Sequence, residues 1–131
     1  MQTEEIAEKV KKVISEAMGI NLEDINLNSR LVADLGAESI DFLDITFRLE
    51  REFGVKLKTD EMFPTGIFQG KEGGYIVNGR VIPEGVAKLK EAIPFGNFQT
   101  WEKNPEYATI TDIFTVGSIV NYIGMQQKVI S

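Results

Sequence analysis

Apolar residues recur at helical spacing in two stretches, one near each end of the chain. Residues 3–19 carry one apolar stripe, made of Ile6, Val10, Val13, Ile14 and Ala17. Residues 115–123 carry a second stripe at positions i, i+3, i+4 and i+7, made of Val116, Ile119, Val120 and Ile123. Thr115 precedes the second stripe as a candidate N-cap. Both patterns predict amphipathic helices with one buried face.

A third helical pattern runs over residues 40–53, between a candidate N-cap at Ser39 and a stop at Gly54. The inward face is predicted to comprise Leu43, Ile45, Thr46, Leu49 and Phe53. Another face combines Ile40, Asp44 and Phe47, and is predicted to be a mixed apolar and acidic surface. Phe47 is equally compatible with the core, since large apolar residues are usually inside. Residues 20–38 mix Asn, Asp and Gly with isolated Leu and Ile, which predicts a long, partly packed loop.

The composition changes between residues 64 and 108. Two β-prone pieces, residues 75–77 and 80–82, flank Asn78-Gly79, a strong hairpin signal. Pro83 then opens a short helix that Pro94 ends. Shorter helical pieces are predicted at residues 60–63 and 110–114. We expect one domain over residues 1–131, with residues 64–108 inserted within it.

Aromatic residues follow this short helix in an irregular segment, at Phe95, Phe98 and Trp101. We expect them to pack the inserted segment onto the helices. The alternatives are that they line an apolar pocket or form a partner surface.

The composition excludes most self-contained catalytic sites. The 131 residues include no histidine and no cysteine, so the commonest general base, thiolate nucleophiles and cysteine-bound metals are absent. The Asp24, Asn26 and Asn28 series does not predict a calcium loop, because the turn glycine and the bidentate acid are missing. We therefore expect neither an enzyme nor a metal protein.

The net charge is −6, and basic residues balance acidic ones within residues 64–108. The excess negative charge therefore lies in the two flanking segments. This distribution argues against nucleic-acid binding and favours basic protein partners. Charges interrupt every apolar run, so we expect no membrane insertion, no secretory signal and a cytoplasmic location.

The stretch LVADLGAESIDFLDITFRLEREFGVKL, residues 31–57, resembles the central segment of acyl carrier proteins. In that family D-L-G-x-D-S-L leads into an acidic helix with an E-E-F-like ending. The stretch TVGSIVNYI resembles the family's last helix. The resemblance implies a mainly α fold: an acyl-carrier-like four-helix bundle, here with an inserted β-hairpin and short helix where the family has a short third helix. Carriers enlarged in this way resemble the specialised acyl carrier proteins of bacteria.

The resemblance also implies a function. Ser39 would bear 4′-phosphopantetheine, on which acyl chains are held as thioesters in fatty-acid or specialised lipid biosynthesis. A phosphopantetheinyl transferase would supply the base and the magnesium, so the chain would be its substrate. Acyl-processing enzymes with basic docking patches would bind through Glu38, Ile40, Asp41, Asp44, Phe47 and Glu50. The family expectation is a monomer.

The sequence departs from the family pattern at several positions. Glu38 replaces the usual Asp and Ile40 the usual Leu around the serine, which preserves charge and apolarity. Arg48, Arg51 and Lys56 add positive charge on or just beyond the acidic helix, which favours dedicated partners. Two alternatives stay open: a peptidyl or aminoacyl carrier of a secondary-metabolite pathway, and an unmodified protein-interaction module.

Overall fold

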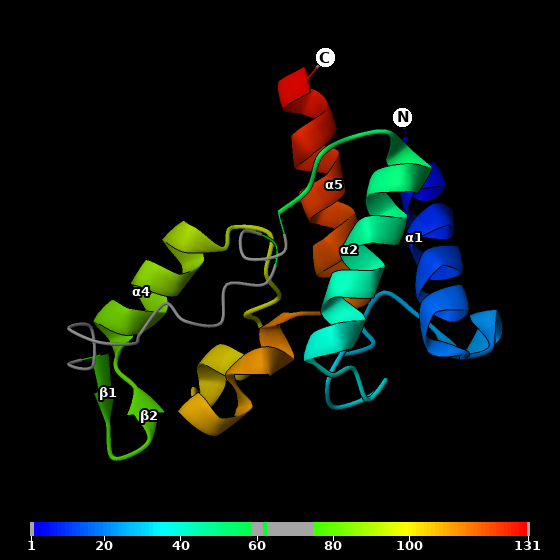
Figure 1. The fold of residues 1–131 in the computed structure, drawn as a ribbon. Helices are drawn as coiled ribbons and strands as arrows, with labels where there is room; N and C mark the ends of the chain where they lie inside the picture. Colours follow the sequence, from blue (N-terminus) through cyan, green and yellow to red (C-terminus); the bar gives the residue numbers. More distant parts are fainter. Residues whose placement is uncertain (1, 59–61, 63–74, 131) are drawn as a thin grey trace.

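The protein is described here by a computed structural model, which covers residues 2–58, 62 and 75–130, with side chains as far as Gln126. Three long helices form its main body: α1 (Thr3–Met18), α2 (Ser39–Phe53) and α5 (Val116–Ile130). Helix α1 packs against both α2 and α5, as Figure 1 shows. The mainly helical fold predicted from the sequence is confirmed.

The buried faces of α1 and α5 are the apolar stripes of the sequence. Ile6, Val10 and Ile14 of α1 are buried, and so are Ile119 and Ile123 of α5. The two stripes meet in one hydrophobic core. Burial of these side chains supplies the main driving force for joining the two ends of the chain.

Helix α5 begins with a reciprocal cap. The backbone N–H of Ser118 donates to Thr115 Oγ1 at 3.1 Å, and the N–H of Thr115 donates to Ser118 Oγ at 3.0 Å. Both residues are buried, so these bonds satisfy donors that water cannot reach. The predicted N-cap at Thr115 is confirmed.

The predicted hairpin and short helix are also confirmed. Strands β1 (Ile76–Val77) and β2 (Arg80–Val81) pair antiparallel. Asn78 and Gly79 have φ angles of 54° and 77°, which is the left-handed conformation that a two-residue type I′ turn requires at both positions. Helix α4 (Pro83–Ala92) follows directly, with proline in its first turn.

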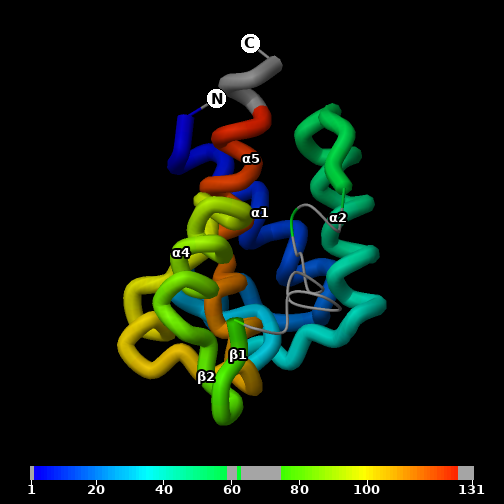
Figure 2. The backbone as a smooth tube through the Cα atoms, turned by 90° about the vertical axis from the view of Figure 1, so that its left-hand side faces the viewer, coloured from blue at the N-terminus to red at the C-terminus, as the bar shows by residue number. Residues whose placement is uncertain are grey.

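The aromatic residues after α4 are buried, as expected if they pack this part of the chain onto the helices. Phe95 contacts the ring of Tyr122 in α5, with centroids 4.8 Å apart, and Phe98 meets Trp101 edge-on at 6.3 Å. Leu89 of α4 belongs to the same hydrophobic core as the long helices. Figure 2 shows α4 lying in front of α5, with α1 behind.

Shorter helical segments complete the described chain. These are the 3₁₀ helices η1 (Leu22–Asp24), η3 (Trp101–Lys103) and η4 (Tyr107–Ile113). The loop predicted over residues 20–38 contains η1 and buries Ile25 and Leu31, and η4 covers most of the piece predicted at 110–114. Apart from the buried Met62, the turn predicted at 60–63 lies outside the described residues, as does the beginning of the predicted insertion.

Candidate functional site

Ser39 is the first residue of α2 and is exposed. The prediction that it is the N-cap is wrong, because Glu38 occupies that position in extended conformation. Asp41 reaches back, and its Oδ2 accepts a hydrogen bond from the Glu38 N–H at 2.8 Å. These two neighbours provide the cap, and the Ser39 hydroxyl has no hydrogen-bond partner among the described residues. It is therefore free for chemistry without cost to the helix.

The loop before Ser39 is tied to the beginning of α5. The Leu31 N–H donates to the carbonyl of Phe114 at 3.0 Å, and the Ala37 N–H donates to the carbonyl of Leu31 at 2.8 Å. Leu31 and Ala37 are both buried. The end of this loop, and with it the position of Ser39, is thus fixed by residues far along the sequence.

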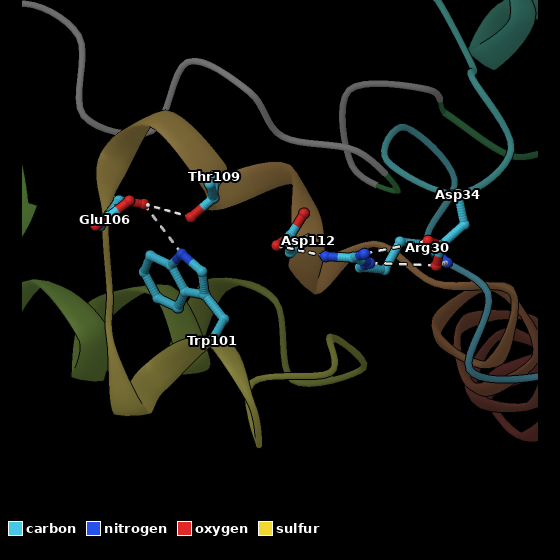
Figure 3. A network of polar contacts seen from close by, with 6 residues as sticks. All are labelled: Arg30, Asp34, Trp101, Glu106, Thr109 and Asp112. Atoms are coloured by element: carbon cyan, nitrogen blue, oxygen red, sulfur yellow. Dashed lines mark hydrogen bonds and ion pairs between the residues drawn. The ribbon is translucent and has the colours of Figure 1, made fainter.

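Arg30 makes a second tie, shown in Figure 3. Its guanidinium contacts Asp34 and Asp112, each at 3.1 Å. The hydrogen bond from Arg30 is the main cause that lowers the pKa of Asp34, and the two carboxylates raise the pKa of Arg30. Arg30, held within its own loop by Asp34 of the DLG motif, therefore joins this loop to Asp112 of η4.

Gly36 gives a test of this loop. Its φ is +75°, and a Cβ built there would meet nothing within 4 Å, so any cost of a side chain is conformational. We expect Gly36→Ala to lower the free energy of unfolding by about 1–2 kcal/mol, measured by urea denaturation. Gly124→Ala is the matched control: that site is equally open but lies inside α5, and there alanine should stabilise by about 0.5–1 kcal/mol. Equal effects at both sites would contradict the left-handed assignment.

The exposed face of α2 is unusually apolar. Ile40 is 71% exposed, Leu43 47% and Phe47 60%. The surface predicted from Ile40 and Phe47 is present, and a place in the core for Phe47 is excluded. The inward placement of Leu43 is wrong: three and four residues separate it from Ile40 and Phe47, so it shares their stripe. We call Ile40, Leu43 and Phe47 the apolar stripe of α2.

The acids predicted to dock partners have different surroundings. Glu38 and Asp41 lie at the start of α2 beside Ser39, and Asp44 pairs with Arg48 at 3.1 Å. Glu50 lies towards the other end, where its Oε2 accepts a hydrogen bond from the Leu57 N–H at 2.9 Å. The structure therefore groups the first three acids near Ser39 and gives Glu50 a role in holding the turn after α2.

The far end of α2 carries charges of both signs. Arg51 and Lys56 are exposed there. Both line an open groove of about 530 Å³, together with Glu50, Phe47 and Val55. The surface of α2 is consequently acidic beside Ser39 and of mixed charge away from it.

Other classes of site are not found within the part of the chain that the structure describes. No group of three or more acidic side chains is gathered there in a way that could hold a metal ion. No helix there is both long enough and apolar enough to cross a bilayer.

Comparison with known sequences identifies a family that matches the region around Ser39. The family described as "Phosphopantetheine attachment site" matches residues 8–65, which include Ser39 and all of α2. The acyl carrier protein of Thermotoga maritima is 44% identical over 54 residues, which are 41% of this chain and 67% of the relative. The acyl carrier protein of Nitratidesulfovibrio vulgaris strain DP4 is 38% identical over 56 residues, or 43% and 74%. No solved structure matches.

Acyl carrier proteins are carriers and not enzymes, which agrees with the lack of a catalytic constellation in the sequence. Their prosthetic group is 4′-phosphopantetheine, and the matched region contains the attachment domain for it. The sequence identity, the matched attachment domain and the helical fold together show that this chain belongs to the acyl carrier protein family.

Proposed function

We propose that this chain carries acyl groups as thioesters on a 4′-phosphopantetheine arm attached to Ser39, in fatty-acid or specialised lipid biosynthesis. The observation that carries the proposal is the Ser39 hydroxyl, which is exposed at the start of α2 and takes no part in capping it. When bound, the group supplies a flexible arm ending in a thiol. Tethering of this kind replaces free encounter by a high effective concentration.

The residues around Ser39 fit this group. A phosphodiester on Ser39 would lie in the first turn of a 15-residue helix, where the helix dipole favours negative charge. The cap between Glu38 and Asp41 leaves the side chain of Ser39 pointing to solvent without competing for it. A transferase can therefore reach the hydroxyl while α2 stays intact.

The surface next to Ser39 suits protein partners. The apolar stripe of α2 offers Ile40, Leu43 and Phe47 to a partner, with Glu38, Asp41 and Asp44 at its Ser39 end. Large apolar side chains surrounded by charge are typical of interaction surfaces. We propose that a phosphopantetheinyl transferase and acyl-processing enzymes dock their basic patches here, and that Glu50 contributes at the far end.

The proposal also covers the choice of partner enzymes, the role of residues 64–108, the oligomeric state and the cellular location. The positive charges that Arg51 and Lys56 add at and just beyond the end of α2 favour dedicated partners over the general enzymes of fatty-acid synthesis. Residues 64–108 would act as an insertion that changes which partners or acyl chains are accepted. The chain would work as a monomer in the cytoplasm.

The experiment is intact-protein mass spectrometry after incubation with coenzyme A, magnesium and a broad-specificity phosphopantetheinyl transferase. We expect a gain of one phosphopantetheinyl group, mapped by fragmentation to the peptide that contains Ser39. Because the chain has no cysteine, the free-thiol content should rise from zero to one per chain. No gain with several transferases, on folded protein, would overturn the proposal and favour an interaction module that binds through the apolar stripe. Trial loading with fatty acyl and aminoacyl groups would separate the two carrier classes.

A further inference from the structure

A hollow of about 630 Å³ lies where three parts of the chain meet. Its lining includes Asn28 and Arg30 from the loop before α2, Gln99 and Trp101 from the segment after α4, and Asp112 from η4. Figure 3 shows part of this junction, with Trp101 on one side, Asp112 between and Arg30 on the other. The hollow is thus built jointly by the loop before α2, the segment after α4 and η4.

The charged groups of the hollow are already paired. Arg30 is held by Asp34 and Asp112, and Glu106 accepts a hydrogen bond from the Asn104 amide at 3.3 Å. Carboxylates are at least as numerous as cations in the lining, so a phosphate or carboxylate ligand would meet no free positive charge. An anionic ligand is therefore disfavoured.

The uncharged polar side chains of the lining, in contrast, are largely unpaired within the protein. In residues 2–58, 62 and 75–130 the side-chain amides of Asn28 and Gln99 have no protein hydrogen-bond partner, and the same holds for the Thr100 hydroxyl. All three residues are exposed, so these groups are open to solvent or to a ligand. The Asn97 side chain accepts one weak bond of 3.4 Å from the Gln99 N–H, which leaves its amide N–H₂ unused. Trp101 adds an apolar ring in the wall, fixed by a 3.0 Å bond from its Nε1–H to the carbonyl of Glu106. Such a lining matches an uncharged chain that carries amides, hydroxyls and apolar carbons.

Ser39 follows one wall of this hollow closely along the chain. Asp34, bonded to the wall residue Arg30, precedes Ser39 by five residues, so their Cα atoms are at most about 18 Å apart even in a fully extended chain. The 4′-phosphopantetheine arm is a chain of comparable length. Beyond its phosphodiester it is uncharged and consists of amides, a hydroxyl and apolar carbons.

We propose that the hollow is a resting site for the arm's pantetheine portion, with the phosphodiester remaining at Ser39. This inference rests on the proposed function, since it takes Ser39 as the point of attachment. Tethering gives an effective concentration of about a millimolar or more, so weak binding in the hollow is enough to hold the arm. The segment after α4 would then act on the prosthetic group directly, by holding it close to the protein between partners.

The composition of the chain allows a clean test. Trp101 is the single tryptophan and there is no cysteine, so the arm's thiol is unique and can be labelled with a maleimide nitroxide. In the loaded protein we expect the nitroxide to quench Trp101 fluorescence and broaden its indole N–H signal. Both effects should fall at least threefold in Gln99→Leu and stay unchanged in Asn21→Leu, a matched exposed position outside the hollow. Nitroxide-capped pantetheine in solution, at equal concentration, measures collisional quenching.

A second arm of the experiment needs no loading. Free pantetheine added to the Ser39→Ala protein should change Trp101 fluorescence with saturation in the millimolar range, and inorganic phosphate should not. Loading confirmed by mass, together with quenching no stronger than the free-nitroxide control, would overturn the resting site and leave the proposed function intact. An absence of loading would count against Ser39 as the attachment point, while the titration with pantetheine would still decide whether the hollow binds this chemistry.

Discussion

Ser39→Ala should abolish phosphopantetheinylation completely while leaving the fold almost unchanged. The substitution removes the only hydroxyl at the start of α2, so the mass gain and the new thiol should both disappear. Ser39 is exposed and Glu38 and Asp41 supply the cap, so the free energy of unfolding should change by less than about 0.5 kcal/mol. Intact mass measures the first effect, and urea denaturation followed by Trp101 fluorescence measures the second.

Ser118→Ala provides the matched control for this substitution. Ser118 is 2% exposed and holds the reciprocal cap of α5, so its loss leaves the Thr115 N–H without a partner. We expect the free energy of unfolding to fall by about 1–2 kcal/mol. The protein that remains folded should be phosphopantetheinylated normally. Persistent loading of Ser39→Ala would show that the attachment point lies elsewhere.

Leu89→Ala should destabilise the whole chain by about 2–5 kcal/mol, because it opens a cavity at a fully buried position. Leu89 lies in α4, yet it belongs to the same hydrophobic core as the long helices. We therefore expect the protein to unfold as one unit. Trp101 fluorescence reports on the segment after α4, whereas far-UV circular dichroism is dominated by α1, α2 and α5. The midpoints of urea denaturation measured by these two signals should fall together.

Ile123→Ala, at a fully buried position of α5, is the companion variant. It should lower both midpoints together, by a similar amount. If Leu89→Ala shifted the fluorescence transition alone, then residues 64–108 would be a separate folding unit, and the expectation of one domain with an insertion would have to be abandoned.

The helices with one apolar face were the most predictable part of the fold. In α1 and α5 every strongly apolar position of the stripe is in the core, so periodicity and burial carry the same information. The hairpin was predictable for a different reason: Asn78-Gly79 is one of the few dipeptides that adopt the left-handed turn readily. In these elements local chemistry and tertiary packing agree.

Helix α2 was less predictable because it has two apolar faces. Ile45 and Leu49 are buried, whereas Ile40, Leu43 and Phe47 are exposed. Hydrophobic periodicity does not distinguish an apolar face that packs on the core from one that stays exposed. For this reason the sequence pattern predicts Leu43 on the inward face, although it is exposed. The prediction that Ser39 is the N-cap was wrong for a related reason. Glu38 and Asp41 are also residue types that can cap a helix, and only the three-dimensional structure decides among them.

The surroundings of Ser39 carried still less signal in the sequence. Arg30 and Asp112 are 82 residues apart, and nothing in the spacing of either residue points to the other. The hollow beside them requires the loop before α2, the segment after α4 and η4 to come together. Such a site follows from the tertiary fold, so single-sequence patterns do not reveal it.

The tie between the loop before Ser39 and the start of α5 has a consequence for biosynthesis of the chain itself. Leu31 donates to the carbonyl of Phe114, and the N–H of Val116 donates to the carbonyl of Ser29. During translation the earlier residues leave the ribosome long before their partners exist, so the loop cannot reach its final form on a nascent chain that stops short of residue 116. A transferase would therefore meet an ordered Ser39 only on chains that have been synthesised beyond residue 116. An ordered Ser39 would thus distinguish these chains from shorter nascent ones.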